Sequence, residues 1–149
     1  MVRSSNRDYV SAQENSDEKS NKEKAIIKYG HISNWNTQYI TTMSNLFKFK
    51  GSFNEPLYWD TKNVTDMSRM FTLATAFNQP IGDWDVSNVA DMQGMFSNAL
   101  TFNQPISNWD VSNGNDFGSM FSFETSFSQD IISSFNLGVC FQSLGRTIT

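Results

Sequence analysis

The sequence predicts an α/β solenoid in which each repeat of 24–25 residues supplies one short parallel strand and one short helix. The first observation is that the tryptophans recur in steps of 24, 25 and 25 residues, at Trp35, Trp59, Trp84 and Trp109. The second is that two phenylalanine series and all three prolines keep this period: Phe47, Phe71, Phe96 and Phe121; Phe53, Phe77, Phe102 and Phe127; Pro56, Pro80 and Pro105. A fixed period between about 20 and 50 residues is typical of solenoids, propellers and arrays.

The strand is expected where Trp84 and Val86 alternate with Asp85, because a half-buried strand alternates apolar and polar residues. A short helix is expected after the Ser-Asn break, since the next apolar residues are spaced by three and four: Val89, Met92, Met95, Phe96 and Ala99. Asn88 stands where a helix N-cap belongs, and Asp91 resembles the acidic partner of a capping box. Proline in the following Phe-Asn-Gln-Pro-Ile segment ends the helix and turns the chain.

Stacked copies bury the apolar faces that one repeat of this size cannot cover alone. We expect a solenoid at residues 25–137, with an atypical first coil at 25–58 and regular coils at 59–83, 84–108 and 109–134. This gives about four to five coils, and at least about three are needed for stability. In the last regular coil Gly114 replaces a valine and Phe117 replaces a methionine, which is expected to open a gap under Trp109.

The two ends of the chain depart from the repeat. Residues 1–24 are polar and charged, so we expect a disordered tail, with an interaction or targeting tail as the alternative. Residues 138–149 are expected to fray or to cap the last coil, unless the chain is a shortened member of a longer array, which we favour slightly. No apolar signal region begins the chain, and no run of about 18 apolar residues predicts a membrane span.

Composition argues against several classes of function. The net charge is −4 and no basic stripe is present, so a nucleic-acid binder is not expected. His31 has no catalytic partner at a suggestive spacing, and the lone cysteine, Cys140, is expected to be buried as a small apolar residue. No phosphate-binding loop or zinc motif is present. We therefore predict no catalytic residues, no resident metal and no cofactor.

The segment WDVSNVADMQGMFSNALTFNQPISNWDVSN resembles the tandem repeat of the BspA-like leucine-rich-repeat surface proteins, best known from mycoplasma and other bacterial lipoproteins. The resemblance covers about residues 25–137 and implies a leucine-rich-repeat-like solenoid. In that geometry Trp84 and Val86 point into the core and Asp85 points outward. The resemblance also implies surface display and adhesion, although this chain shows neither a signal peptide nor an anchor, and it brings no catalytic residues.

Asp60, Asp85 and Asp110 would then form an outward row with a spacing of about 5 Å. One hypothesis is a surface for a cation or a basic partner, since hard cations prefer oxygen ligands. The favoured alternative is that each carboxylate accepts backbone N–H bonds from the turn two residues on. The amides that follow a phenylalanine in each turn are likewise expected to satisfy turn backbone groups: Asn54, Asn78 and Asn103.

Two functions follow from these observations. The first is a non-enzymatic interaction module whose face with Asp60, Asp85 and Asp110 binds a protein or a glycan, because solenoids present extended surfaces. The second is a structural or spacer element of a larger surface array, with end-to-end self-association through the C-terminal coil.

Overall fold

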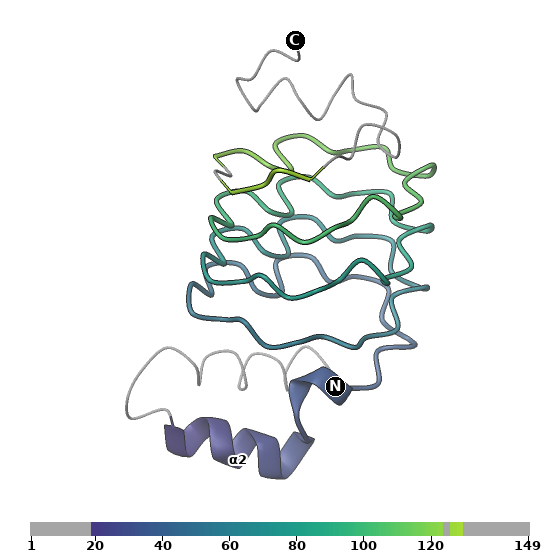
Figure 1. Ribbon diagram of the computed structural model, residues 1–149. Coiled ribbons are helices and arrows are strands. Elements are labelled where there is room, and N and C mark those ends of the chain that lie inside the picture. The colour runs from purple at the N-terminus through teal and green to yellow at the C-terminus, as the bar shows by residue number, and fades with distance from the viewer. Residues whose placement is uncertain (1–18, 124–125, 130–149) are drawn as a thin grey trace.

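The computed structural model describes residues 19–123 and 126–129, which form a stack of coils with a helix at the N-terminal end (Figure 1). Helix α2 spans Lys19–Tyr29, and a short 3-10 helix, η2, spans Ile32–Asn34. Residues 19–24, which we expected in the polar tail, therefore belong to α2. Residues 1–18 and the expected C-terminal segment 138–149, with Cys140, lie outside the described residues.

The prediction of an α/β solenoid with a strand and a helix in each repeat is wrong, and with it the leucine-rich-repeat-like geometry. Within residues 19–123 and 126–129, α2 is the only α-helix and no extended strand forms. Isolated parallel bridges join successive coils instead, pairing Thr42 with Asp66, Asp66 with Asp91, and Asp91 with Asp116. The coils are therefore built from turns, and the bridges lie at the start of the segment where a helix was expected rather than at the expected strand.

Left-handed residues explain why the expected helix does not form. At residues 67–74 the Met70 N–H donates to the Met67 carbonyl at 3.2 Å, and Arg69 between them has a φ of 54°. A four-residue turn with positive φ at its third residue has the form of a type II turn. The same turn follows four residues later, with Leu73 at a φ of 60°. An α-helix requires negative φ at every residue, so these turns exclude it.

The N–H groups that do not close these turns reach the neighbouring coil. Alternate residues of one coil donate to the carbonyls of the next at 2.8–2.9 Å: Met67 to Asp91, Arg69 to Gln93, Phe71 to Met95, and Leu73 to Ser97. The same series recurs one coil on: Met92 to Asp116, Gly94 to Gly118, Phe96 to Met120, and Asn98 to Ser122. Backbone polar groups are thus satisfied between coils rather than within a helix.

Aromatic rings fill the interior of the stack. Phe96 is fully buried, and its ring centroid lies 5.7 Å from those of both Phe71 and Phe121, with nearly parallel planes. The second phenylalanine series packs beside the first, with Phe102 4.1 Å from Phe96. Such pairs contribute about 0.5–1.5 kcal/mol each beyond the burial of their area. The ring columns explain the aromatic period of the sequence.

The indole N–H groups of the buried tryptophans form hydrogen bonds between coils. Indole N–H groups donate to backbone carbonyls of the preceding coil, at 2.7 Å from Trp59 to Ile32 and at 3.1 Å from Trp84 to Leu57. A buried indole N–H needs such a partner, because an unpaired one costs about 1–3 kcal/mol. This bond accounts for tryptophan, rather than phenylalanine, at this position of the repeat.

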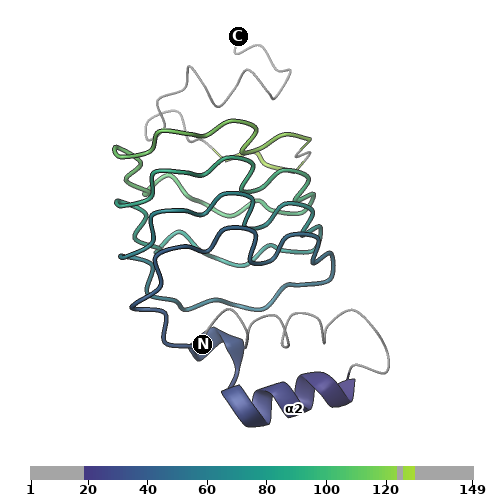
Figure 2. The same ribbon diagram turned by 180° about the vertical axis from the view of Figure 1, so that it is seen from behind.

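Helix α2 lies across the N-terminal end of the stack (Figure 2). Its Ala25 is buried, and the Lys22 ammonium lies 2.7 Å from the Glu55 carboxylate of the first coil. Glu55 stands where later coils have a glutamine that pairs with the preceding coil. It also lies 3.5 Å from His31 Nε2. The first coil therefore uses a charged side chain to hold the helix that covers it.

Candidate functional site

The aspartate row predicted from the sequence lies on an exposed side of the stack. Asp60, Asp85 and Asp110 are all exposed, and each stands between two buried residues. In the central coil these are Trp84 and Val86, which are 6% and 1% exposed. The expected inward and outward orientation of this segment is therefore confirmed, even though the segment is not a strand.

Each carboxylate of the row closes a tight turn. Its Oδ1 accepts the N–H of the residue two positions later: Lys62 to Asp60 at 3.2 Å, Ser87 to Asp85 at 3.0 Å, and Ser112 to Asp110 at 3.0 Å. This Asx-type bond confirms the structural role that we favoured for the row. The turn fixes the direction in which each carboxylate projects.

Hydrogen bonding also stabilises the ionised form of two members of the row. Bonds from the Ser87 hydroxyl and from its N–H lower the pKa of Asp85 and outweigh burial and the charge of Asp110, which raise it. The Ser112 hydroxyl and N–H likewise lower the pKa of Asp110. Donors that bond the ionised form favour it. Both groups are therefore carboxylates at neutral pH.

The second oxygen distinguishes these two residues from Asp60. Asp60 Oδ2 lies 3.3 Å from the Lys62 ammonium, so its charge is partly offset. Serine replaces this lysine in the two later coils. Both printed bonds of Asp85, from the Ser87 N–H and hydroxyl, go to Oδ1, so within the described chain its Oδ2 has no hydrogen-bond or ion-pair partner. Two exposed carboxylates are thus held in place by serine residues and carry no ion pair in the described chain.

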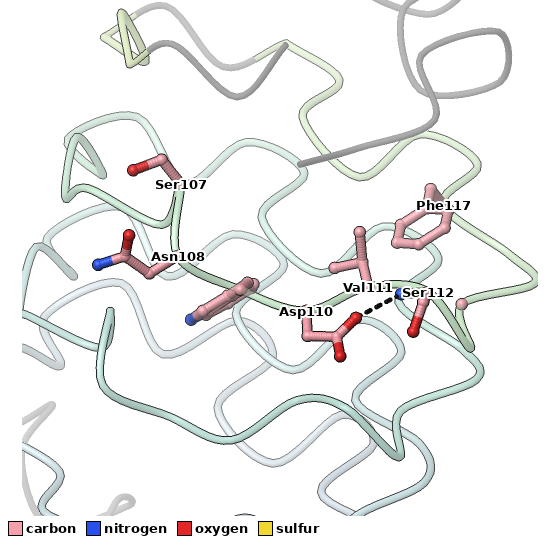
Figure 3. Close-up of a pocket in the computed structure, with 8 residues that line it drawn as sticks. Ser107, Asn108, Asp110, Val111, Ser112 and Phe117 are labelled. Atoms are coloured by element: carbon pink, nitrogen blue, oxygen red, sulfur yellow. Dashed lines mark hydrogen bonds between the residues drawn. The ribbon is translucent and has the colours of Figure 1, made fainter. Parts of the chain in front are cut away.

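A hollow of about 480 Å³ lies beside Asp110 in the last described coil (Figure 3). Its lining combines polar and apolar groups: Ser107, Asn108, Trp109, Asp110, Val111, Ser112, Gly114 and Phe117. Figure 3 shows the bond from the Ser112 N–H to the Asp110 carboxylate at its edge. The row therefore ends at a concave surface that has an aromatic side chain and a carboxylate together.

The gap expected under Trp109 is present, but Phe117 fills part of the space. A Cβ added at Gly114 would overlap the Phe117 ring, which thus occupies the place of the missing side chain. Val64 and Val89 hold this position in the two preceding coils, each followed three residues later by a methionine. Glycine and phenylalanine therefore compensate one another in the last coil.

Amide side chains tie the turns of successive coils together. Asn78 Oδ1 accepts the Asn103 N–H at 2.9 Å, and the Gln104 side-chain N–H₂ donates to both the backbone carbonyl and Oδ1 of Asn78. The same pattern joins Asn54 to the next coil. The expected role of these asparagines is confirmed. The glutamine partners were not anticipated, although their shared phase in the repeat was a signal for them.

The expected N-cap asparagines have a different role, because no helix follows them. Asn88 Nδ2 donates to the Lys62 carbonyl at 2.8 Å, and Asn113 Nδ2 donates to the Ser87 carbonyl at 2.7 Å. Asp91, the expected capping-box partner, accepts the Gln93 N–H at 2.8 Å. These side chains connect coils or close turns.

Other residues weighed as chemical groups show no converging site in the described chain. His31 Nδ1 accepts the Ser33 N–H at 3.3 Å and so caps η2. Residues 19–123 and 126–129 bring no three His, Cys, Asp or Glu side chains together in a group able to hold a metal ion. The aspartate row therefore presents its carboxylates one by one along the stack.

Comparison with known proteins places the repeat in a family. No curated protein and no solved structure matches the chain. Among the described helices, none has the length and apolarity needed to cross a membrane. A family model described as "Mycoplasma protein of unknown function, DUF285" matches residues 16–135, which covers the helix, every described coil and the aspartate row. The chain therefore belongs to the DUF285 family of Mycoplasma proteins of unknown function.

Proposed function

We propose that this protein is a non-enzymatic interaction module that binds a protein or glycan partner through the face carrying Asp60, Asp85 and Asp110. The observation that supports it best is the repeated geometry of the last two members. In each, an exposed ionised carboxylate is fixed by hydrogen bonds from a serine two residues on. Groups fixed before binding lose less conformational entropy when a partner arrives.

The chemistry of the face indicates the groups that a partner offers. Carboxylate oxygens accept hydrogen bonds, so lysine and arginine side chains or sugar hydroxyls complement them. Tyr58, two residues before Asp60, is 73% exposed, and tyrosine is enriched in binding surfaces because it offers area at low entropy cost. The hollow beside Asp110 adds an indole and a phenyl ring.

The closer assignment to BspA-like surface repeats is part of this proposal. It is supported by the W-D-V-S-N-V segment of the third coil, which contains Asp85 and Ser87. A role in surface display would place the aspartate row where extracellular proteins and glycans are the available partners.

A binding panel of immobilised glycans and of lysine- or arginine-rich peptides tests the proposal. The variant Asp85→Asn keeps the Oδ1 acceptor for the turn but removes the charge. It should bind a captured ligand about fivefold more weakly, the equivalent of about 1 kcal/mol. Glu23→Gln on α2 is the control, because it makes the same charge change at an exposed site away from the row. Equal binding by wild type and Asp85→Asn would refute the assignment of this face.

The hollow at Trp109 favours a second candidate, a structural element that joins other copies through its last coil. Its aromatic lining is the kind of surface that a further coil covers in the rest of the stack. Sedimentation at increasing concentration separates the two candidates. Association that Val111→Asp abolishes would support the structural role, and a monomer at all concentrations would exclude it.

A further inference from the structure

Asn113 and Gly114 form the one Asn-Gly step of the sequence. Structural needs explain each residue separately. Asn113 bonds the preceding coil, and Gly114 makes room for the Phe117 ring. Their combination nevertheless has a chemical consequence, because asparagine followed by glycine is prone to spontaneous deamidation. Asn63 and Asn88, at the same position in earlier coils, are followed by valine, whose branched side chain hinders that reaction.

The reaction uses only the backbone and water. The Gly114 nitrogen attacks Cγ of Asn113, a new N–C bond closes a succinimide ring, and the side-chain nitrogen leaves as ammonia with the displaced proton. Water then opens the ring and leaves either aspartate or isoaspartate at position 113. No oxidant, reductant or cofactor is needed.

The folded coil holds both reacting groups in hydrogen bonds. The Gly114 N–H donates to the Val111 carbonyl at 2.9 Å, within the turn that follows Asp110. The leaving nitrogen, Asn113 Nδ2, donates to the Ser87 carbonyl at 2.7 Å. Attack requires the Gly114 nitrogen to lose its proton and to turn toward Cγ, which breaks the first bond. Release of ammonia breaks the second.

We propose that Asn113 is a deamidation site that the stacked fold keeps unreactive and that reacts when the last described coil opens. Gly114 lines the hollow of that coil, whereas Val64 and Val89 at the same position are fully buried. Local opening is cheapest where few apolar groups are buried. The reaction rate then equals the rate in the unfolded chain multiplied by the fraction of time that this turn is open.

Deamidation would prevent the coil from closing as before. A carboxylate at position 113 places an acceptor against the Ser87 carbonyl, where Asn113 now places a donor. It also adds a negative charge three residues from Asp110. Isoaspartate additionally lengthens the backbone inside the turn. The modification therefore acts as an irreversible switch of the exposed face, and it does not depend on what that face binds.

Mass spectrometry of peptides from the full chain, incubated at mildly alkaline pH, tests the proposal. Asn113 should deamidate at least about tenfold more slowly in native buffer than in urea above the unfolding midpoint, which corresponds to at least about 1.4 kcal/mol of opening. Asn88 is the internal control and should stay unmodified in both conditions.

A variant distinguishes protection of Asn113 by the folded coil from the intrinsic deamidation rate of the Asn-Gly step. Phe117→Ala removes the ring packed against Gly114, so it should raise the native rate at Asn113 and leave the rate in urea unchanged. Equal deamidation rates in native buffer and in urea would overturn the claim that the fold protects Asn113. Absence of product in urea would overturn the site itself. A native rate unaffected by Phe117→Ala would overturn opening of this coil as the route.

Discussion

Replacing Gly94 with alanine tests the turn-based coil, because a left-handed turn and a helix predict opposite effects on stability. Gly94 has a φ of 62° and stands third in its turn. Asn45, Arg69 and Ser119 hold the same place in the other coils, also with positive φ. The position is therefore left-handed in every described coil, whichever residue occupies it.

The size of the destabilisation expected for Gly94→Ala follows from the left-handed backbone conformation rather than from a steric clash. The left-handed region costs a residue with a Cβ about 1–2 kcal/mol, and the smaller entropy of unfolded alanine returns about 0.4–1 kcal/mol. The nearest atom to the added Cβ would be Arg69 Cγ at 3.4 Å, which is a tolerable contact. Gly94→Ala should therefore lower the free energy of unfolding by about 1 kcal/mol. In a helix it would raise it by about 1 kcal/mol.

Urea unfolding followed by tryptophan fluorescence measures this difference, since the buried indoles become exposed and the midpoint reports stability at constant slope. Ser119→Gly is the matched control in the next coil. It relieves the same strain, so it should raise the midpoint or leave it unchanged. A higher midpoint for Gly94→Ala together with a lower one for Ser119→Gly would refute the left-handed turns.

Further predictions concern packing and charge. Phe96→Ala should lower the free energy of unfolding by about 3–5 kcal/mol in the same titration, because its buried ring joins three coils; a loss below about 1 kcal/mol would contradict the ring column. As a single change, Gly114→Val should destabilise the protein. The double variant that also carries Phe117→Met should recover most of the lost stability. The folded pKa values of Asp85 and Asp110 are depressed, so their contribution is fully present above the ordinary value of 3.8 and is lost as pH falls through the lower folded values. Replacing both with asparagine should flatten the acid limb of a melting-temperature titration, and an unchanged limb would count against these bonds.

The period of the sequence was enough to predict which side chains enter the core. Trp84, Val86 and Phe96 are buried as their positions in the repeat required, and Asp85 is exposed. When large apolar residues recur at the same position of every repeat, stacking of the repeats buries them together. The prediction of which side chains are buried therefore does not depend on the local backbone conformation. It holds even though the predicted strand and helix are absent.

The backbone itself could not be predicted from apolar spacing. Two consecutive turns with inward residues three and four apart give the same spacing as one face of a helix, so Met92, Met95 and Phe96 fit both. Gly94 and Asn98, which favour left-handed conformations, were the available signal against a helix. In the neighbouring coil Arg69 occupies the same left-handed place, and its residue type gives no such signal.

The candidate site was predictable in part for the same reason. The Asx bond of Asp85 follows from the residue type and from the turn two residues on. The bonds from Asn88 to the preceding coil were not predictable, because they depend on how the coils are aligned in space. The position of the Asp110 carboxylate beside the hollow likewise depends on how the turn and the neighbouring residues of the coil are arranged in space.

Scalar couplings across hydrogen bonds, measured by NMR in the labelled protein, test the central claim most directly. In stacked turns the Phe71 N–H donates to the Met95 carbonyl of the next coil. We therefore expect a cross-peak that joins the Phe71 amide to the Met95 carbonyl. In a helix the same amide would bond the carbonyl four residues earlier, at Met67. A cross-peak from Phe71 to Met67 would contradict the account.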